Sequence, residues 1–126
     1  MNKKIISAAL SMLVLIAIGA QLSKREAAQS ANVSMNRDVQ TIQISATPTA
    51  YEPNITIARA NMPSVIQLNS QNNYGCTREL RIPALNVQAT LPNTGQEQIK
   101  LSAQAKGSVL DAVCSMGMYR FSIRFE

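Results

Sequence analysis

The sequence predicts an all-β domain of about seven strands, arranged as two packed antiparallel sheets behind an apolar N-terminal segment. Three observations support this fold class. Beyond residue 38, short runs rich in Ile, Val and Thr alternate with polar residues. Pro, Gly and Asn separate these runs, and no long helical pattern follows residue 22. Roughly 90 residues with this spacing suit a β-sandwich.

The N-terminal segment has the layout of a secretory signal. Lys3 and Lys4 precede an apolar run of 16 residues, positions 5–20, and charged residues follow at 24–26. Ala20 is small enough for the residue before a cleavage site, but Ile18 is too large for the position two residues earlier. We therefore expect residues 1–22 to be either a signal peptide or an uncleaved signal anchor in an apolar helix. Both predict export, to the periplasm or to the extracytoplasmic face of a membrane.

The rest of the chain divides into a polar linker and one domain. Residues 23–38 are small and polar without periodicity, so we expect a linker there and a folded domain over 39–126. The whole chain carries 12 basic and seven acidic residues, a net charge of +5, but residues 31–126 carry eight and six, a net charge of +2. That part has no basic block and few aromatic residues, which argues against a nucleic-acid partner.

The predicted strands follow the period-two alternation of apolar residues. In chain order they span 39–45, 55–59, 64–70, 79–82, 97–103, 108–113 and 119–125. Loops or turns are expected at 71–73, 91–95 and 106–107. The residues expected to face the core include Ile42, Ile44, Ile55, Ile57, Ile66, Leu68, Ile99, Leu101, Phe121, Ile123 and Phe125.

The chain has no histidine, two cysteines and six methionines. Without histidine there is no Ser-His or Cys-His catalytic pair and no imidazole metal ligand. Glu79 and Glu97 are isolated acids, so carboxylate-based hydrolysis is also unsupported. We expect a protein that is not an enzyme, and sulfur is the remaining donor chemistry.

The segment from Cys114 to Met118 places three sulfurs within five residues, between two predicted strands. Thiolates and thioethers are soft donors, which select Cu(I) over hard cations. Methionines ordinarily fill cores, and this explanation suits Met35 and Met62. It suits Met116 and Met118 less well, because they flank a glycine in an expected loop beside a cysteine.

Cys76 lies 38 positions before Cys114, a separation at which strands of a Greek-key sandwich can be neighbours. In an oxidising compartment, two cysteines also predict a structural disulfide. The residues alone leave both interpretations open. A thiol-disulfide oxidoreductase is the weakest alternative, because the chain has no Cys-x-x-Cys motif.

Over residues 51–126 the chain resembles small exported cupredoxin-like domains of bacterial proteins, which occur alone or fused to metal-transport proteins. The matching segments come in the family's order: Tyr51-Glu52-Pro53-Asn54-Ile55, Met62-Pro63-Ser64-Val65, Gly75-Cys76-Thr77-Arg78-Glu79-Leu80, Ile82-Pro83-Ala84-Leu85-Asn86-Val87 with Leu91-Pro92, and Cys114-Ser115-Met116-Gly117-Met118-Tyr119-Arg120. The resemblance implies a Greek-key cupredoxin-like sandwich with a metal site at one end.

By that resemblance, Cys114 lies on the loop between the last two strands, and Cys76 lies where blue-copper proteins place their first histidine. A blue site needs two histidines, so the resemblance here implies Cu(I) held by Cys76, Cys114, Met116 and Met118, or by one cysteine and the two methionines. The implied partners are the copper ion and a copper transporter or another metal-handling protein of the cell envelope, with membrane contact through residues 1–22 if these are uncleaved.

The chain departs from the family pattern beside this site. Ser115 and Phe121 stand where glycines are usual, and residues 108–113 differ from the usual approach strand. We therefore keep two expectations. The first is copper sequestration, delivery or sensing. The second is a structural or interaction sandwich with a Cys76–Cys114 disulfide and a decayed metal site.

Overall fold

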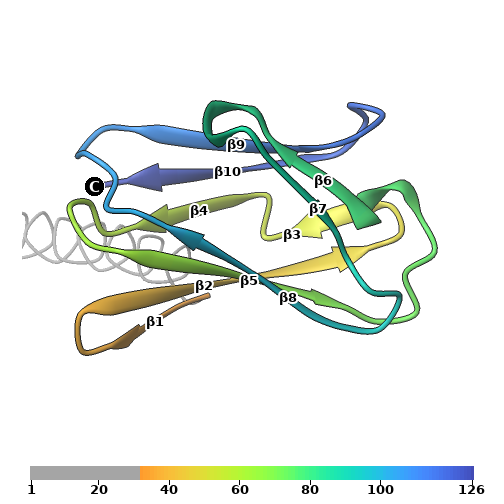
Figure 1. Cartoon of the computed structure of the whole chain (residues 1–126), viewed down its shortest axis with the longest axis horizontal. Coiled ribbons are helices and arrows are strands. Elements are labelled where there is room, and N and C mark those ends of the chain that lie inside the picture. The colour runs from red at the N-terminus through yellow and green to blue at the C-terminus, as the bar shows by residue number, and fades with distance from the viewer. Residues whose placement is uncertain (1–31) are drawn as a thin grey trace, which may run out of the picture.

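A computed structural model describes residues 32–126 as ten strands and two short 3-10 turns, arranged in two five-stranded sheets (Figure 1). Within these residues no helix is long and apolar enough to cross a membrane, and the predicted signal segment at 1–22 lies outside them. The elements are β1 Val33–Asn36, β2 Val39–Thr47, β3 Ala50–Glu52, β4 Ile55–Ala58, β5 Ser64–Ser70, η1 Cys76–Arg78, β6 Glu79–Ile82, η2 Pro83–Leu85, β7 Val87–Thr90, β8 Gly95–Leu101, β9 Val109–Cys114 and β10 Arg120–Phe125.

The two sheets are mixed, so the expectation of purely antiparallel sheets was wrong. The first sheet has the order β1-β2-β5-β8, with β3 paired to β2, and the second has the order β4-β10-β9-β6-β7. The pairs β2–β5 and β4–β10 are parallel. Parallel neighbours need a connection that crosses over rather than a hairpin. The chain supplies one by leaving the first sheet after β3, adding β4 to the second sheet and returning as β5.

All seven predicted strands are present, and β1, β3 and β7 are additional. Strand β1 lies within residues 23–38, so that range is not a linker throughout, and the folded domain begins before Val39. The strand pairs with β2 across a turn in which Arg37 has a φ of 52°. The side-chain amide of Asn32 fastens its start by donating to the Gln43 carbonyl at 3.0 Å and the Thr56 hydroxyl at 2.9 Å. The added strands are only three or four residues long, too short for a clear alternation.

The core lies between the sheets and consists of the alternating apolar residues of the long strands. Strand β4 is an exception to the expected pattern, because Thr56 and Ala58 are buried while Ile55 is 41% exposed. Thr56 and Ala58 pair in parallel with Ile123 and Phe125 of β10, which are buried, so the register turns them inward. The buried apolar residues are Ile42, Ile44, Ala46, Tyr51, Ala58, Ile66, Leu68, Leu80, Ile82, Leu91, Ile99, Leu101, Leu110, Ala112, Cys114, Phe121, Ile123 and Phe125.

The sandwich has two distinct ends. The connection between β9 and β10 lies at the end drawn on the right in Figure 1, together with the arrowhead of β2. The start of β2, the end of β4 and the C-terminus lie at the left. We call the right end, with residues 47–48, 73–78 and 114–119, the sulfur end. The left end, with Gln40, Arg59 and Ser64, is the far end.

Candidate metal centre

Strand pairing in the second sheet brings the two cysteines together. Cys114 ends β9 and is buried, and Cys76 opens η1, the turn that leads directly into β6. Strands β6 and β9 pair with Leu80 opposite Cys114, and the Ser115 amide donates to the Glu79 carbonyl at 2.8 Å. The two thiols lie close enough for each to shift the pKa of the other, and both are free in this structure. The half-buried Cys76 therefore packs against the core cluster that contains the fully buried Cys114.

The two thiols differ in their tendency to ionise. Burial raises the pKa of Cys76, and the hydrogen bond it donates to Cys114 and the charge on that sulfur act in the same direction. Burial also opposes ionisation of Cys114, but the amide groups of Tyr119, Met118 and Met116 and the Cys76 thiol outweigh it and lower the Cys114 pKa. The Tyr119 amide nitrogen lies 3.4 Å from the Cys114 sulfur. Of the two thiols, Cys114 is thus the one that ionises more readily.

The loop after Cys114 is shaped by its own backbone hydrogen bonds. The Cys114 amide donates to the Tyr119 carbonyl at 2.9 Å, and the Gly117 amide donates to the Cys114 carbonyl at 2.9 Å. Gly117 has a φ of 73°, a conformation that glycine adopts without steric cost. The loop consequently curls its amide groups around the Cys114 sulfur.

Met116 and Met118 lie on this loop and are 70% and 66% exposed. Neither thioether fills the core, as we expected from their position beside a glycine. They are also largely open to solvent rather than enclosed with the thiols. The structure therefore assembles the cysteine pair and leaves the methionines as exposed side chains on the adjoining loop.

Within residues 32–126 no three or more His, Cys, Asp or Glu side chains gather in a way that could hold a metal ion. A metal at this end would have to draw on the two thiols and on thioether sulfur. Such a donor set fits a soft, low-coordination ion and does not fit hard cations, which need several oxygens.

Comparison with known proteins identifies the architecture. No protein-family profile and no curated protein sequence matches the chain. Among solved structures, the metal-binding domain of the Cu(I)-exporting P-type ATPase CopA from Streptococcus pneumoniae, solved with Cu(I), aligns with a TM-score of 0.66 and 19% identity, covering 75% of this chain and 92% of that domain. A copper-binding protein in its apo form aligns with a TM-score of 0.67 and 17% identity, covering 75% and 94%.

The fold is a cupredoxin-like β-sandwich. A third alignment, to a chain in the structure of a heme-copper terminal oxidase dimer, has a TM-score of 0.50 and 14% identity and covers 99% of this chain and all of that one. At these identities the likeness concerns the fold. The sulfur chemistry of this cupredoxin-like domain rests on its own residues.

The site also depends on three buried polar residues, Tyr51, Asn73 and Thr77, for which the sequence predicted no role at the site. The Tyr51 hydroxyl donates to the Thr77 carbonyl at 2.7 Å, and the Asn73 side-chain amide donates to the Thr77 hydroxyl at 2.9 Å. Burial raises the pKa of Tyr51, and the nearby Cys114 and Cys76 sulfurs add to this effect. The sequence offered one signal, since Asn two residues before Gly favours an Asx turn. The Asn73 side-chain oxygen does accept from the Gly75 amide at 2.9 Å.

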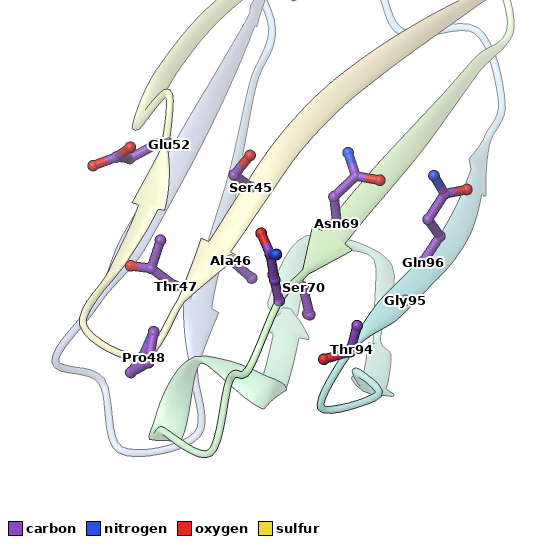
Figure 2. Close-up of a pocket in the computed structure, with 11 residues that line it drawn as sticks. Ser45, Ala46, Thr47, Pro48, Glu52, Asn69, Ser70, Thr94, Gly95 and Gln96 are labelled. Carbon is purple, nitrogen blue, oxygen red and sulfur yellow. The ribbon is translucent and has the colours of Figure 1, made fainter.

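A polar hollow of about 620 Å³ lies in this cupredoxin-like domain without any sulfur in its wall (Figure 2). Ser45, Asn69 and Gln96 come from neighbouring strands of the first sheet and line it together with Thr94 and Glu52. The turn at residues 47–48 also lines the hollow, and the same turn contacts the Cys76 segment. The hollow therefore adjoins the sulfur end but contributes no ligand to it.

Proposed function

We propose that this protein is an exported or membrane-anchored copper-binding module that carries Cu(I) as cargo, for sequestration, delivery or sensing at the cell envelope. The observation that carries the proposal is the pairing of β6 with β9, which brings Cys76 and Cys114 to one end of a cupredoxin-like sandwich without histidine, with Met116 and Met118 on the adjoining loop. Two structurally similar proteins are a Cu(I)-exporter domain and a copper-binding protein, which supports the choice of metal.

The donor set favours Cu(I) over Cu(II) and over a blue electron-transfer centre. A blue centre uses two histidines, one cysteine and a weak axial ligand, and this chain has no histidine. Two thiolates and a thioether form the soft, low-coordination environment in which Cu(I) is stable. Thiols must lose their protons to bind the ion, so metal binding releases protons to solvent.

The four sulfur residues have different roles in Cu(I) binding because they differ in exposure to solvent. Cys114 offers a sulfur whose charge is stabilised by the amides of the loop, and Cys76 closes on the ion from η1. Met116 and Met118 reach into solvent beside this pair, where an arriving ion or a partner's ligand meets them first. Such an arrangement suits exchange with a copper transporter or another envelope metal-handling protein.

Cu(I) titration of the reduced full chain against a chromophoric Cu(I) chelator tests the proposal. We expect one copper per chain in native mass spectra and no intense visible absorption. The variant Cys114→Ser combined with Met118→Leu should lose most of its Cu(I) affinity, while Met35→Leu, an exposed methionine of β1, should keep it. An intense blue absorption band, or unchanged affinity in the double variant, would contradict the proposal.

The contact between the thiols also favours a second candidate, a structural or interaction sandwich with a Cys76–Cys114 disulfide. This candidate predicts that the exported chain is two hydrogens lighter than the dithiol form. It also predicts that the reduced chain takes up no copper. Mass spectrometry with and without reductant and Cu(I) separates the two candidates.

A further inference from the structure

The segment that carries Cys76 is fastened by a cluster of buried polar groups, which we call the Cys76 clamp: Tyr51, Asn73 and Thr77. Asn73 and Thr77 are fully buried, and Tyr51 is nearly so. Asn73 donates to the Ala46 carbonyl at 3.0 Å and to the Thr77 hydroxyl at 2.9 Å, and the Thr77 hydroxyl donates to the Thr47 carbonyl. Tyr51 completes the clamp by donating to the Thr77 carbonyl at 2.7 Å.

The clamp leaves the Cys76 segment little room to move. A Cβ atom on Gly75 would lie 2.2 Å from the Pro48 carbonyl oxygen, so the backbone before Cys76 is pressed directly against the turn at 47–48. The Gly75 amide is held by the Asn73 side chain at 2.9 Å. On the other side of Cys76, the Arg78 side chain donates to the Leu91 carbonyl at 3.0 Å. Cys76 is therefore flanked by fixed groups on both sides.

We propose that Asn73, Thr77 and Tyr51 are positioning residues that hold the Cys76 sulfur opposite Cys114 before any ion arrives. This inference rests on the proposed function and deepens it. Cys114 is fixed by β9 and by the loop amides, so the clamp determines whether the second thiol is in place. Groups that orient a ligand typically change metal affinity 10- to 100-fold when removed, because the ligand must otherwise be ordered during binding.

The far end provides a matched control. There the buried Gln40 side chain donates to the Arg59 carbonyl at 2.6 Å and to the Ser64 hydroxyl at 2.9 Å, and it accepts from the Arg59 amide at 2.9 Å. The Gln40 and Ser64 side chains are as buried as the clamp, and this second cluster also joins segments distant in sequence. It lies at the opposite end of the sandwich from the cysteines (Figure 1).

The test compares Thr77→Val, Thr77→Ser, Tyr51→Phe and Gln40→Leu in the full chain. Thr77→Val removes the hydroxyl at nearly constant shape, and Thr77→Ser restores it. Two quantities are measured on each folded variant: the Cu(I) dissociation constant by chelator competition, and the alkylation rate of Cys76 in the reduced, copper-free protein. We expect Thr77→Val to weaken Cu(I) binding about tenfold or more and to speed alkylation, and Tyr51→Phe to do the same to a smaller extent.

Thr77→Ser and Gln40→Leu should leave both quantities close to those of the unaltered chain, although Gln40→Leu lowers the urea midpoint. The inference is overturned if folded Thr77→Val and Tyr51→Phe show unaltered alkylation and affinity, or if Gln40→Leu shifts both as strongly as they do. If the unaltered chain binds no Cu(I), the proposed function fails. The alkylation rates then decide by themselves whether the clamp positions Cys76.

Discussion

Both ends of the sandwich contain buried polar groups that must find hydrogen-bond partners, but only the sulfur end carries cysteines. Each end has a buried polar cluster that joins β2 of the first sheet to a segment next to the second sheet. At the sulfur end Asn73 and Thr77, which precede β6, bond to β2, and at the far end Gln40 of β2 bonds to Arg59, which follows β4. Buried polar groups must be paired, and both clusters satisfy this requirement. Only the sulfur end adds reactive side chains to its cluster. The comparison indicates that a buried polar cluster at each end is part of the fold. The difference between the ends is that the cluster at the sulfur end holds a segment that carries a cysteine.

Substitution of core aromatic residues should cause the largest loss of stability, and it tests whether the two ends of the sandwich differ. Phe121 and Phe125 are both fully buried on β10, and only Phe121 packs edge-on against Tyr51, with ring centroids 5.2 Å apart at 68°. Replacing either residue by Ala should lower the free energy of unfolding by about 3–5 kcal/mol through cavity formation. Urea unfolding measures this loss.

Only Phe121→Ala should also increase the alkylation rate of Cys76, because it removes the support of the Tyr51 ring. The contrast between the ends would be lost if Phe125→Ala exposed Cys76 to the same degree in a folded protein.

Gly75→Ala gives the next largest effect. Gly75 has an ordinary backbone conformation with a φ of −87°, so the cost comes from the added methyl group, which would lie 2.2 Å from the Pro48 carbonyl oxygen. Backbone on both sides must shift, and we expect a loss of about 1–3 kcal/mol in unfolding free energy. Chemical denaturation measures the loss, and Cu(I) competition should show weaker binding in the same variant. A fully stable Gly75→Ala protein with unaltered Cu(I) affinity would show that this contact can relax freely.

Alanine substitutions at two glycines with positive φ distinguish the effect of backbone strain on stability from the effect of loop geometry on Cu(I) affinity. Gly117 in the sulfur loop has a φ of 73° and Gly107 in the turn before β9 has a φ of 86°, and a Cβ meets nothing within 4 Å at either position. Alanine at each should therefore cost about 1–2 kcal/mol of stability from left-handed strain alone. Cu(I) affinity should fall only for Gly117→Ala, because only that loop shapes the amides around Cys114. Equal effects on Cu(I) affinity would contradict a local role for the loop.

Substitution of the exposed methionines should have the smallest effect on stability, and it should lower Cu(I) affinity only at Met116 and Met118. Met116→Leu and Met118→Leu should change the unfolding free energy by less than about 0.5 kcal/mol, since both side chains are mostly in solvent. Each should weaken Cu(I) binding by removing a thioether. Met35→Leu is the matched control, because Met35 is 46% exposed on β1 and should change neither quantity. Chelator competition on the three variants would contradict thioether ligation if all three behaved alike.

Much of the fold was predictable because it depends on local pattern. The long strands β2, β5, β8, β9 and β10 carry apolar residues at period two, and most of those residues are buried. The pattern gave a wrong prediction for strand β4. Ile55 and Ile57 were expected to face the core because they alternate with Thr56 and Ala58, but in the structure Thr56 and Ala58 are the buried residues. The orientation of β4 comes from the parallel register with β10, which depends on residues some 67 positions away, from Ile55 to Ser122. A short strand cannot encode that register in its own sequence.

The donor chemistry of the candidate site was determined by the sequence alone. A chain with two cysteines, six methionines and no histidine can offer a soft ion only thiol and thioether sulfur, wherever these residues lie. Which sulfurs meet was decided by the tertiary structure. Pairing of β6 with β9 brings the thiols to the same end of the sandwich, the buried Asn73 and Thr77 fasten the segment that carries Cys76, and the loop leaves both methionines largely in solvent. Residue identity is a local property, whereas these contacts arise from hydrogen bonds between segments far apart in the chain.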